Sequence, residues 1–197
     1  MFNKNNLVIN ELAHDNRDGI NCVAFRKDKT VATDNYVLCE VKNPKEMQDD
    51  EEFPIIPEEE IKFKDCLVEK SIVRKVLKNL KEVKIKALPI LQNAIFLKSD
   101  GVKIATTNLE KLDIVRGNKN TNQYPEYEEI ISNGKPKSSV IINVEYLKKV
   151  CSVLSQMDLG ATSEIDLKLF GEDKPLQITA KTKQGQSVIA LIMPIKH

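Results

Sequence analysis

The sequence predicts an α+β fold in which antiparallel strands form sheets and amphipathic helices pack against them. One observation is the helical spacing of Leu147, Val150 and Leu154, which follows Asn143, a residue type that commonly caps a helix. A second is a series of short runs with alternating apolar residues, separated by turns rich in glycine and charged residues. A third is that the order of one helix followed by several strands occurs more than once along the chain.

The last third of the chain, residues 139–195, shows this order most completely. A short apolar strand is expected at 139–142, ahead of the helix, and Gly160 closes the helical region because glycine readily adopts positive φ. Three further strands are expected at 164–170, 175–182 and 187–192.

Residues 62–120 repeat the order. A strand is expected at 66–68, and Ser71 is expected to cap a helix that runs from Ile72 to Leu80 and places its apolar residues on one face. The strands that follow are expected at 89–97, 102–107 and 111–115.

The N-terminal part contains strands but no clear helix. Strands are expected at 20–25, 30–33 and 36–41, whereas residues 7–12 fit either a strand or a short helix. We therefore expect a first domain at residues 1–121, whose first half is strand-rich and helix-poor, and a C-terminal domain or half-domain at 122–197.

Composition excludes several classes of function. The 197 residues include 30 basic and 29 acidic side chains, so a surface for nucleic acid requires that the charges be segregated. No apolar run has the length of a membrane span and the N-terminus lacks a signal-peptide core, which predicts a cytoplasmic protein without membrane contact. Four cysteines without a CxxC pair, and only two histidines, predict buried free thiols and no metal site.

The sequence shows no catalytic motif. It has no GxSxG element, no phosphate-binding glycine loop and no HExxH motif, and its paired acids lie in hydrophilic runs such as the acidic loop at 46–52. Asp34 follows a strand, where an aspartate more often accepts backbone N–H groups in a turn than acts as a general base. We therefore expect a binding protein without catalytic residues or cofactors.

Four short motifs resemble the DNA sliding-clamp family, represented by the β subunit of bacterial DNA polymerase III. They are NVEYL at 143–147, the ending IMPI at 192–195, ATDNYVL at 32–38, and QYPEY at 123–127, which is similar to the linker that joins clamp domains. The ATDNYVL motif departs from the family at Asn35 and Val37, where glycine and arginine are frequent.

The resemblance implies a clamp fold with sheets outside and basic helices facing DNA inside. Two expected helices carry basic residues opposite their apolar faces, as phosphate contacts without sequence preference require. The expected DNA-facing residues are Arg74, Lys75, Lys78, Lys81, Lys148 and Lys149. Outward-facing lysines are also ordinary on a solvated helix, so this alternative stays open.

The resemblance also implies a hydrophobic pocket for partner peptides. One expected wall consists of Thr33, Asn35, Tyr36, Val37 and Leu38, and the other of Leu191, Met193, Pro194 and Ile195. The alternative is that these residues are a core strand and a frayed terminus.

The function implied is that of a non-catalytic processivity clamp or clamp homologue. Its expected partners are duplex DNA, peptides of DNA polymerases or other clamp-binding proteins, a clamp loader, and further copies of the same chain in a homo-oligomer. The alternative is a clamp-derived adaptor or inhibitor that binds protein peptides without binding DNA.

Overall fold

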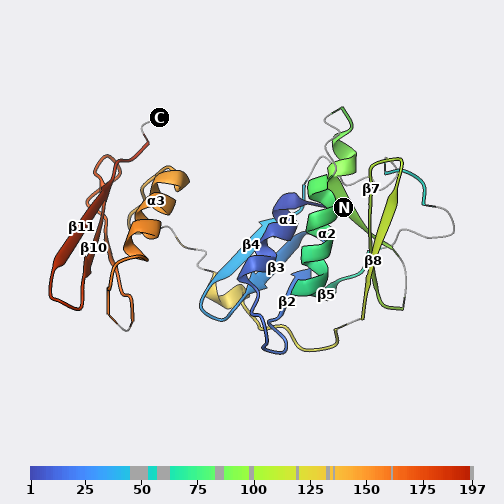
Figure 1. The fold of residues 1–197 in the computed structure, drawn as a ribbon, viewed down its shortest axis with the longest axis horizontal. Helices are drawn as coiled ribbons and strands as arrows, with labels where there is room; N and C mark the ends of the chain where they lie inside the picture. Colours follow the sequence, from blue (N-terminus) through green and yellow to red (C-terminus); the bar gives the residue numbers. More distant parts are fainter. Residues whose placement is uncertain are drawn as a thin grey trace. The chain divides into compact units, whose positions relative to one another are not determined.

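A computed structural model describes residues 1–44, 53–56, 63–82, 87–97, 100–118, 120–131, 134, 136–160 and 162–195. The backbone of 81, 82 and 130 is described without their side chains. The chain divides into two compact units, Met1–Glu129 (unit 1) and Ile130–His197 (unit 2), which are described separately. Figure 1 shows both units.

Unit 1 contains two similar halves, each with a strand, a helical segment and three strands. The first half has β1 (Phe2–Asn3), α1 (Lys4–Val8), the 3-10 helix η1 (Ile9–Leu12), β2 (Cys22–Phe25), β3 (Lys29–Thr33) and β4 (Leu38–Lys42). The second has β5 (Cys66–Glu69), α2 (Lys70–Glu82), the 3-10 helix η4 (Pro89–Gln92), β6 (Asn93–Leu97), β7 (Val102–Thr107) and β8 (Leu112–Gly117). A 3-10 helix, η5 (Glu128–Ile130), follows at the end of the linker.

The two halves exchange their first strands. The sheets have the orders β4-β3-β2-β5 and β1-β6-β7-β8, with neighbouring strands antiparallel. The strand that precedes each helix therefore belongs to the sheet of the other half. One core joins both sheets and both helical segments, and includes Phe2, Phe25, Val76 and Phe96. The aromatic rings of Phe2 and Phe25 pack edge to face at 4.9 Å between centroids.

The spacing of apolar residues explains the position of α2. Its residues Val73, Val76, Leu77 and Leu80 are buried on one face, as expected from their i, i+3, i+4 and i+7 positions. Ser71 lies inside the helix rather than at its cap, because α2 begins at Lys70 directly after β5. Of the two alternatives for residues 7–12, the structure has the helical one, in α1 and η1.

Unit 2 contains a single helix and one sheet. It has α3 (Val144–Leu154), β9 (Asp166–Lys168), β10 (Leu176–Lys181) and β11 (Ser187–Ile192), with sheet order β11-β10-β9. Its core includes Leu154 of α3 and Ile178 of β10. Asn143 caps α3 by accepting the N–H of Glu145 at 2.8 Å.

Two expectations for unit 2 need correction. Residues 139–142 form no strand, because no described strand of the chain pairs with them. The Ile195 N–H donates to the Ile141 carbonyl at 2.8 Å and so connects this segment to the C-terminal end of unit 2. Gly160 does have positive φ, at +94°, but α3 already ends at Leu154 with Ser155 as its C-cap. The acidic loop at 46–52 lies outside the described residues.

The four cysteines are not joined in disulfides and differ in burial. Cys22 is buried, Cys39 and Cys66 are half-buried, and Cys151 is exposed on α3, so the expectation of buried thiols is wrong for Cys151. Burial raises the pKa of the Cys22 thiol to about 11. Within the described part of the chain, no helix is both long and apolar enough to span a bilayer.

Candidate functional site

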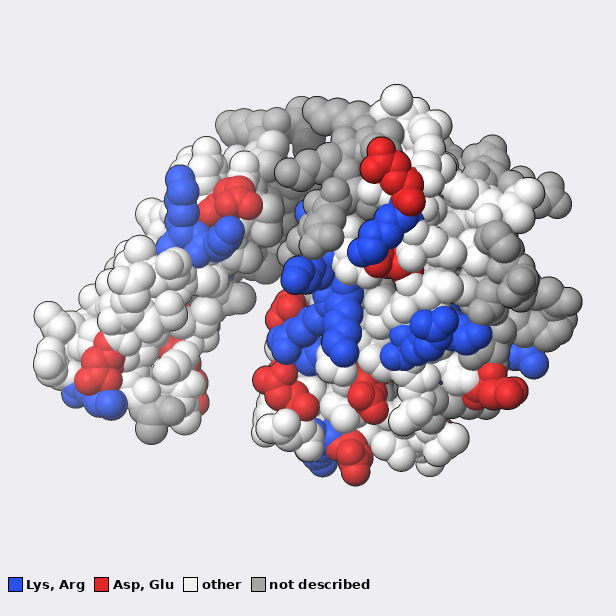
Figure 2. Space-filling model, turned by 45° about the vertical axis from the view of Figure 1, so that its right-hand side comes forward, with Lys and Arg blue, Asp and Glu red and all other residues white. Residues whose placement is uncertain are grey.

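The outer face of α2 carries part of the expected basic surface. Arg74, Lys75 and Lys78 are all exposed, because the helix turns its apolar face to the core. Among the described residues, no acidic side chain forms an ion pair with Lys75 or Lys78. Lys81 lies near the end of α2, and its side chain is outside the described set. Figure 2 shows Lys and Arg side chains gathered on one face of unit 1 with acidic side chains around them.

Arg74 differs from the two lysines because it belongs to an ion-pair cluster. Its Nη2 lies 3.0 Å from Oε2 of Glu11 in η1, and its Nη1 lies 4.0 Å from Oδ1 of Asp15. Lys70 is buried at the base of α2 and also pairs with Asp15, at 2.9 Å, while donating to the Ala13 carbonyl at 2.5 Å. Two acidic side chains therefore offset part of the positive charge at this end of the helix.

The pKa values follow these contacts. The hydrogen bond from Arg74 lowers the pKa of Glu11, and the hydrogen bond from Lys70 lowers the pKa of Asp15. Both carboxylates are therefore charged at neutral pH and compete with any other anion for Arg74. Sequence patterns could not find this cluster, because Glu11 and Arg74 are far apart in the chain.

The basic residues of α3 lie on the exposed side of that helix. Lys148 and Lys149 are both exposed, with Nζ of Lys148 3.9 Å from the Glu145 carboxylate. The Lys149 ammonium lies 5.9 Å from the centroid of the Tyr146 ring, within the range of a cation–π contact. Exposed pairs of this kind contribute at most about 1 kcal/mol, so both cations remain accessible to an anionic partner.

The first expected wall of the peptide pocket is the β3–β4 turn. Thr33 is buried and its hydroxyl donates to the Val37 carbonyl at 2.7 Å, so it supports the turn rather than lining a surface. Asp34 accepts the N–H groups of Tyr36 at 2.9 Å and Val37 at 2.8 Å, as the sequence predicted. Asn35 adopts φ +79°. The turn thereby presents Tyr36 and Val37 to solvent, with Tyr36 95% exposed.

Leu38 connects this wall to the linker. It packs against a cluster that includes the linker residues Tyr124 and Tyr127, and the Tyr124 hydroxyl donates to the Val31 carbonyl at 3.2 Å. Burial raises the pKa of Tyr124, so this hydroxyl stays protonated. The linker motif is thus part of the unit 1 fold and supports the strand beneath Leu38.

The second expected wall lies in unit 2, at the end of β11. Leu191, Met193 and Ile195 are exposed, Pro194 is half-buried, and Ile192 between them points into the core. The alternation of β11 explains why Leu191 is exposed and Ile192 is buried, because the odd-numbered residues of this strand face away from α3. The alternative of a frayed terminus does not hold at Ile195, because its backbone N–H donates to the Ile141 carbonyl.

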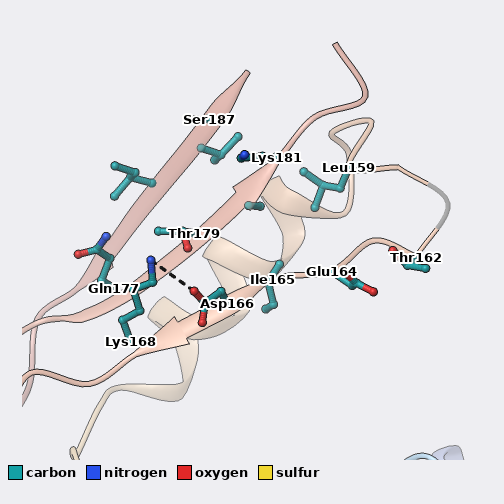
Figure 3. A pocket seen from close by; sticks show the side chains of 13 residues that line it. Leu159, Thr162, Glu164, Ile165, Asp166, Lys168, Gln177, Thr179, Lys181 and Ser187 are labelled. Atoms are coloured by element: carbon teal, nitrogen blue, oxygen red, sulfur yellow. Dashed lines mark ion pairs between the residues drawn. The ribbon is translucent and has the colours of Figure 1, made fainter. Parts of the chain in front are cut away.

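A hollow of about 640 Å³, which the sequence did not indicate, lies at the sheet of unit 2. β9 pairs with β10 only along Asp166–Lys168, so the sheet opens beyond Thr179 and side chains from both of its faces line the hollow. Figure 3 shows Asp166 and Lys168 on one side, joined by an ion pair of 3.3 Å. Its lining combines polar and apolar groups without a cysteine or histidine. Within the described parts of the chain, no three His, Cys, Asp or Glu side chains gather in a way that could hold a metal ion.

Comparison with solved structures identifies the fold as that of bacterial DNA sliding clamps. The chain is similar to the DNA polymerase III subunit β of Borrelia burgdorferi, with TM-score 0.63 and 16% identity over 98% of this chain and 47% of that one. It is similar to the sliding clamp of Pseudomonas aeruginosa, with TM-score 0.62 and 13% identity over 98% and 50%. It is also similar to the β sliding clamp of Caulobacter crescentus, with TM-score 0.60 and 12% identity over 97% and 49%.

The chain spans about half the length of these clamps. No family model matches the sequence. No curated protein matches it either. The likeness is therefore one of fold, and the predicted clamp fold with its antiparallel sheets is confirmed.

Proposed function

We propose that this protein is a non-catalytic clamp homologue that contacts duplex DNA through the basic faces of its helices and docks partner peptides through an apolar pocket. The observation that carries the proposal is the outer face of α2, where Lys75 and Lys78 are exposed and free of acidic partners among the described residues. Flexible ammonium groups on a solvent-facing helix suit contact with phosphates, which carry no base sequence information.

The remaining expected DNA-facing residues extend this surface. Lys148 and Lys149 are exposed on α3, as Lys75 and Lys78 are on α2. Lys81 continues the basic face of α2 in sequence. Arg74 contributes less, because Glu11 and Asp15 pair with it. DNA affinity is therefore expected to be modest, to fall steeply with salt and to show no sequence preference.

Binding of labelled duplex DNA by the full chain, measured at several salt concentrations, tests the proposal. The double variant Lys75→Glu, Lys78→Glu is expected to weaken binding and to reduce the log–log salt slope by about 2 if both lysines contact phosphates. The matched control is Lys27→Glu, Lys42→Glu, which reverses two exposed lysines of β2–β4. Equal loss in both variants would mean a non-specific charge effect, and no loss in either would remove α2 from the DNA surface.

The second candidate is an adaptor or inhibitor that binds protein peptides and no DNA. The pairing of Arg74 with Glu11 and Asp15 favours it, because acidic groups beside a phosphate surface oppose DNA binding. A chain that binds no duplex even at low salt, but still binds a clamp-binding peptide, would establish this candidate. Docking of polymerase peptides, a clamp loader and assembly into a homo-oligomeric ring are parts of the first proposal.

A further inference from the structure

Two short segments cover the faces of the unit 1 sheets that point away from the shared core. We call residues 53–56 the first strap and residues 124–127 the second strap. Each consists of a buried aromatic residue, a half-buried proline, an exposed residue and a second buried residue. The first strap comes after β4 and packs on β6 and β7, whereas the second comes after β8 and packs on β2 and β3. Because each strap follows one half and covers the sheet of the other, the two straps occupy equivalent places.

The sheets beneath the two straps differ at one equivalent position. Ile114 and Glu40 each lie two residues after the first residue of the third strand, in hairpins of the same register. Ile114 packs against the apolar cluster that contains the first strap. The carboxylate of Glu40 instead lies 2.9 Å from Nζ of Lys29, in the sheet that the second strap covers. The position is therefore apolar in one half and part of an ion pair in the other.

Lys29, Glu40 and Tyr127 form one polar cluster, which we call the Lys29 cluster. The Lys29 ammonium lies 5.2 Å from the centroid of the Tyr127 ring, within the range of a cation–π contact, while it pairs with Glu40. Tyr127 is 2% exposed, and the side chains of Lys29 and Glu40 are 20% and 22% exposed. The hydrogen bond to Glu40 raises the pKa of Lys29, so the ammonium stays charged at neutral pH.

Stability alone does not explain the Lys29 cluster. The first strap packs on its sheet with Ile114 in place of the acid, and replacing a buried ion pair by apolar residues is often neutral or stabilising. Apolar contacts have no direction, whereas an ion pair and a ring contact hold only at set distances. The Lys29 cluster therefore fixes where the second strap lies on its sheet.

Two buried residues of the first sheet depend on the position of the second strap. Leu38, from the expected wall of the peptide pocket, packs against the cluster that contains Tyr124 and Tyr127. Cys22 belongs to the same cluster, is fully buried, and its Sγ accepts the side-chain N–H of Asn120 at 3.0 Å. The reactivity of the Cys22 thiol therefore reports whether the linker lies on the sheet.

We infer that Lys29, Glu40 and Tyr127 are positioning residues, which fix the second strap on the first sheet and thereby hold Leu38 in the peptide-binding wall. The inference rests on the proposed function, because the place of Leu38 matters for binding only if this wall takes a partner peptide. Tyr127 is too buried to offer a peptide much surface, so it acts through Leu38. A wall that is held in place before the peptide arrives binds more tightly, since less order has to be created on binding.

The first test measures the strap without any peptide, as the rate at which a thiol reagent modifies Cys22, located by mass spectrometry. Lys29→Met with Glu40→Ile removes both charges together, so neither is left buried and unpaired. We expect several-fold faster modification at an unchanged denaturant midpoint. The matched control, Lys111→Met with Asp113→Ile, removes the 2.7 Å ion pair of the other hairpin and should leave the rate as in the wild type. An unchanged rate, or one that rises only as the midpoint falls, overturns the inference.

The second test measures the affinity of the full chain for a labelled clamp-binding peptide from a bacterial polymerase. Lys29→Met with Glu40→Ile should weaken binding by about tenfold, because the wall loses its preorganisation. Lys29→Arg keeps the cation beside Glu40 and the ring, and should bind like the wild type. Faster Cys22 modification without a loss of affinity would separate the strap from the wall and overturn the inference. A wild type that binds no peptide contradicts the proposed function, while the Cys22 rates still decide whether the Lys29 cluster holds the strap.

If Lys29→Met with Glu40→Ile fails to fold, two substitutions of Tyr127 decide the matter. Tyr127→Ile gives the second strap the residue that the first strap has at Ile56, and Tyr127→Phe keeps a ring over Lys29. The isoleucine variant should show faster Cys22 modification and weaker peptide binding, and the phenylalanine variant should resemble the wild type. Equal behaviour of the two variants would mean that the ring contact positions nothing, which overturns the inference.

Discussion

Two turns of unit 1 are held by the same hydrogen bonds around different side chains. In the β3–β4 turn, Asp34 accepts the Val37 N–H at 2.8 Å, and in the β7–β8 turn Asn108 accepts the Lys111 N–H at 2.7 Å. The residue after each acceptor has positive φ, +79° at Asn35 and +76° at Leu109. Asparagine tolerates this conformation better than leucine, so the backbone strain is smaller in the β3–β4 turn than in the β7–β8 turn.

Asp34 should make the stability of unit 1 depend on pH. The accepted N–H groups of Val37 and Tyr36 lower its pKa in the folded protein, so its contribution is full above the unfolded pKa and is lost as pH falls through the lower folded value. We expect Asp34→Asn to fold, since Asn108 occupies the equivalent turn, and to lose less stability than the wild type between about pH 5 and pH 3. Denaturant unfolding at a series of pH values measures this difference. Parallel curves for the two proteins would show that Asp34 contributes nothing to the pH dependence.

Substitution of Glu11 and Asp15 tests whether the protein is a DNA-binding clamp homologue or an adaptor that binds no DNA. If α2 faces DNA, then Glu11→Gln with Asp15→Asn releases Arg74 and removes two repelling charges, so duplex affinity at low salt should rise several-fold. The double variant Glu126→Gln, Glu129→Gln is the control, because it changes the net charge equally at two exposed carboxylates for which no ion pair with α2 is seen among the described residues. An equal rise in both variants would indicate an effect of net charge alone.

At the scale of the elements, α2 and β8 meet at a point where no side chain fits. A Cβ atom at Gly117 would collide with the Cδ1 of Ile72 and lie 3.2 Å from its Cγ1. We expect Gly117→Ala to destabilise the protein by about 1–3 kcal/mol, because Ile72 is buried and must leave its rotamer. Adding Ile72→Val, which removes the colliding methyl group, should restore part of the loss. Denaturant midpoints of both variants check this, and an unchanged midpoint for Gly117→Ala would mean that the Ile72 side chain moves aside at no cost in stability.

The elements also show what could be predicted from sequence and what could not. The strands β7 and β11 and the helix α2 were predicted nearly at their bounds, because the period of their apolar residues is a local property. The strand expected at 139–142 is wrong for the opposite reason: an apolar run becomes a strand only where another strand offers an edge. The pairing of Arg74 with Glu11 depends on how η1 packs beside α2, which no local pattern contains.

At the scale of the whole chain, the two expected walls of the peptide pocket belong to different units. The β3–β4 turn presents Tyr36 and Val37 from unit 1, and the end of β11 presents Leu191, Met193 and Ile195 from unit 2. If a partner peptide contacts both, the two units act as one site. If the peptide contacts only one wall, the other wall is not part of the peptide-binding site. Mutations in both walls distinguish these cases without any assumption about how the units are arranged.

Removal of residues 193–197 should cost little stability and abolish binding of a labelled clamp-binding peptide from a bacterial polymerase. The described backbone hydrogen bonds lost include that from the Ile195 N–H to the Ile141 carbonyl, worth about 0.5–1.5 kcal/mol.

Tyr36→Ala should weaken binding of the same peptide, because large aromatic anchors carry much of the affinity in such grooves. To keep binding measurable in the double variant, Met193→Ala replaces the truncation in a cycle with Tyr36→Ala. A coupling energy of about 0.5 kcal/mol or more places both side chains in one pocket. Strictly additive losses would assign them to separate contacts, and a truncated chain that unfolds would make the terminus part of the core.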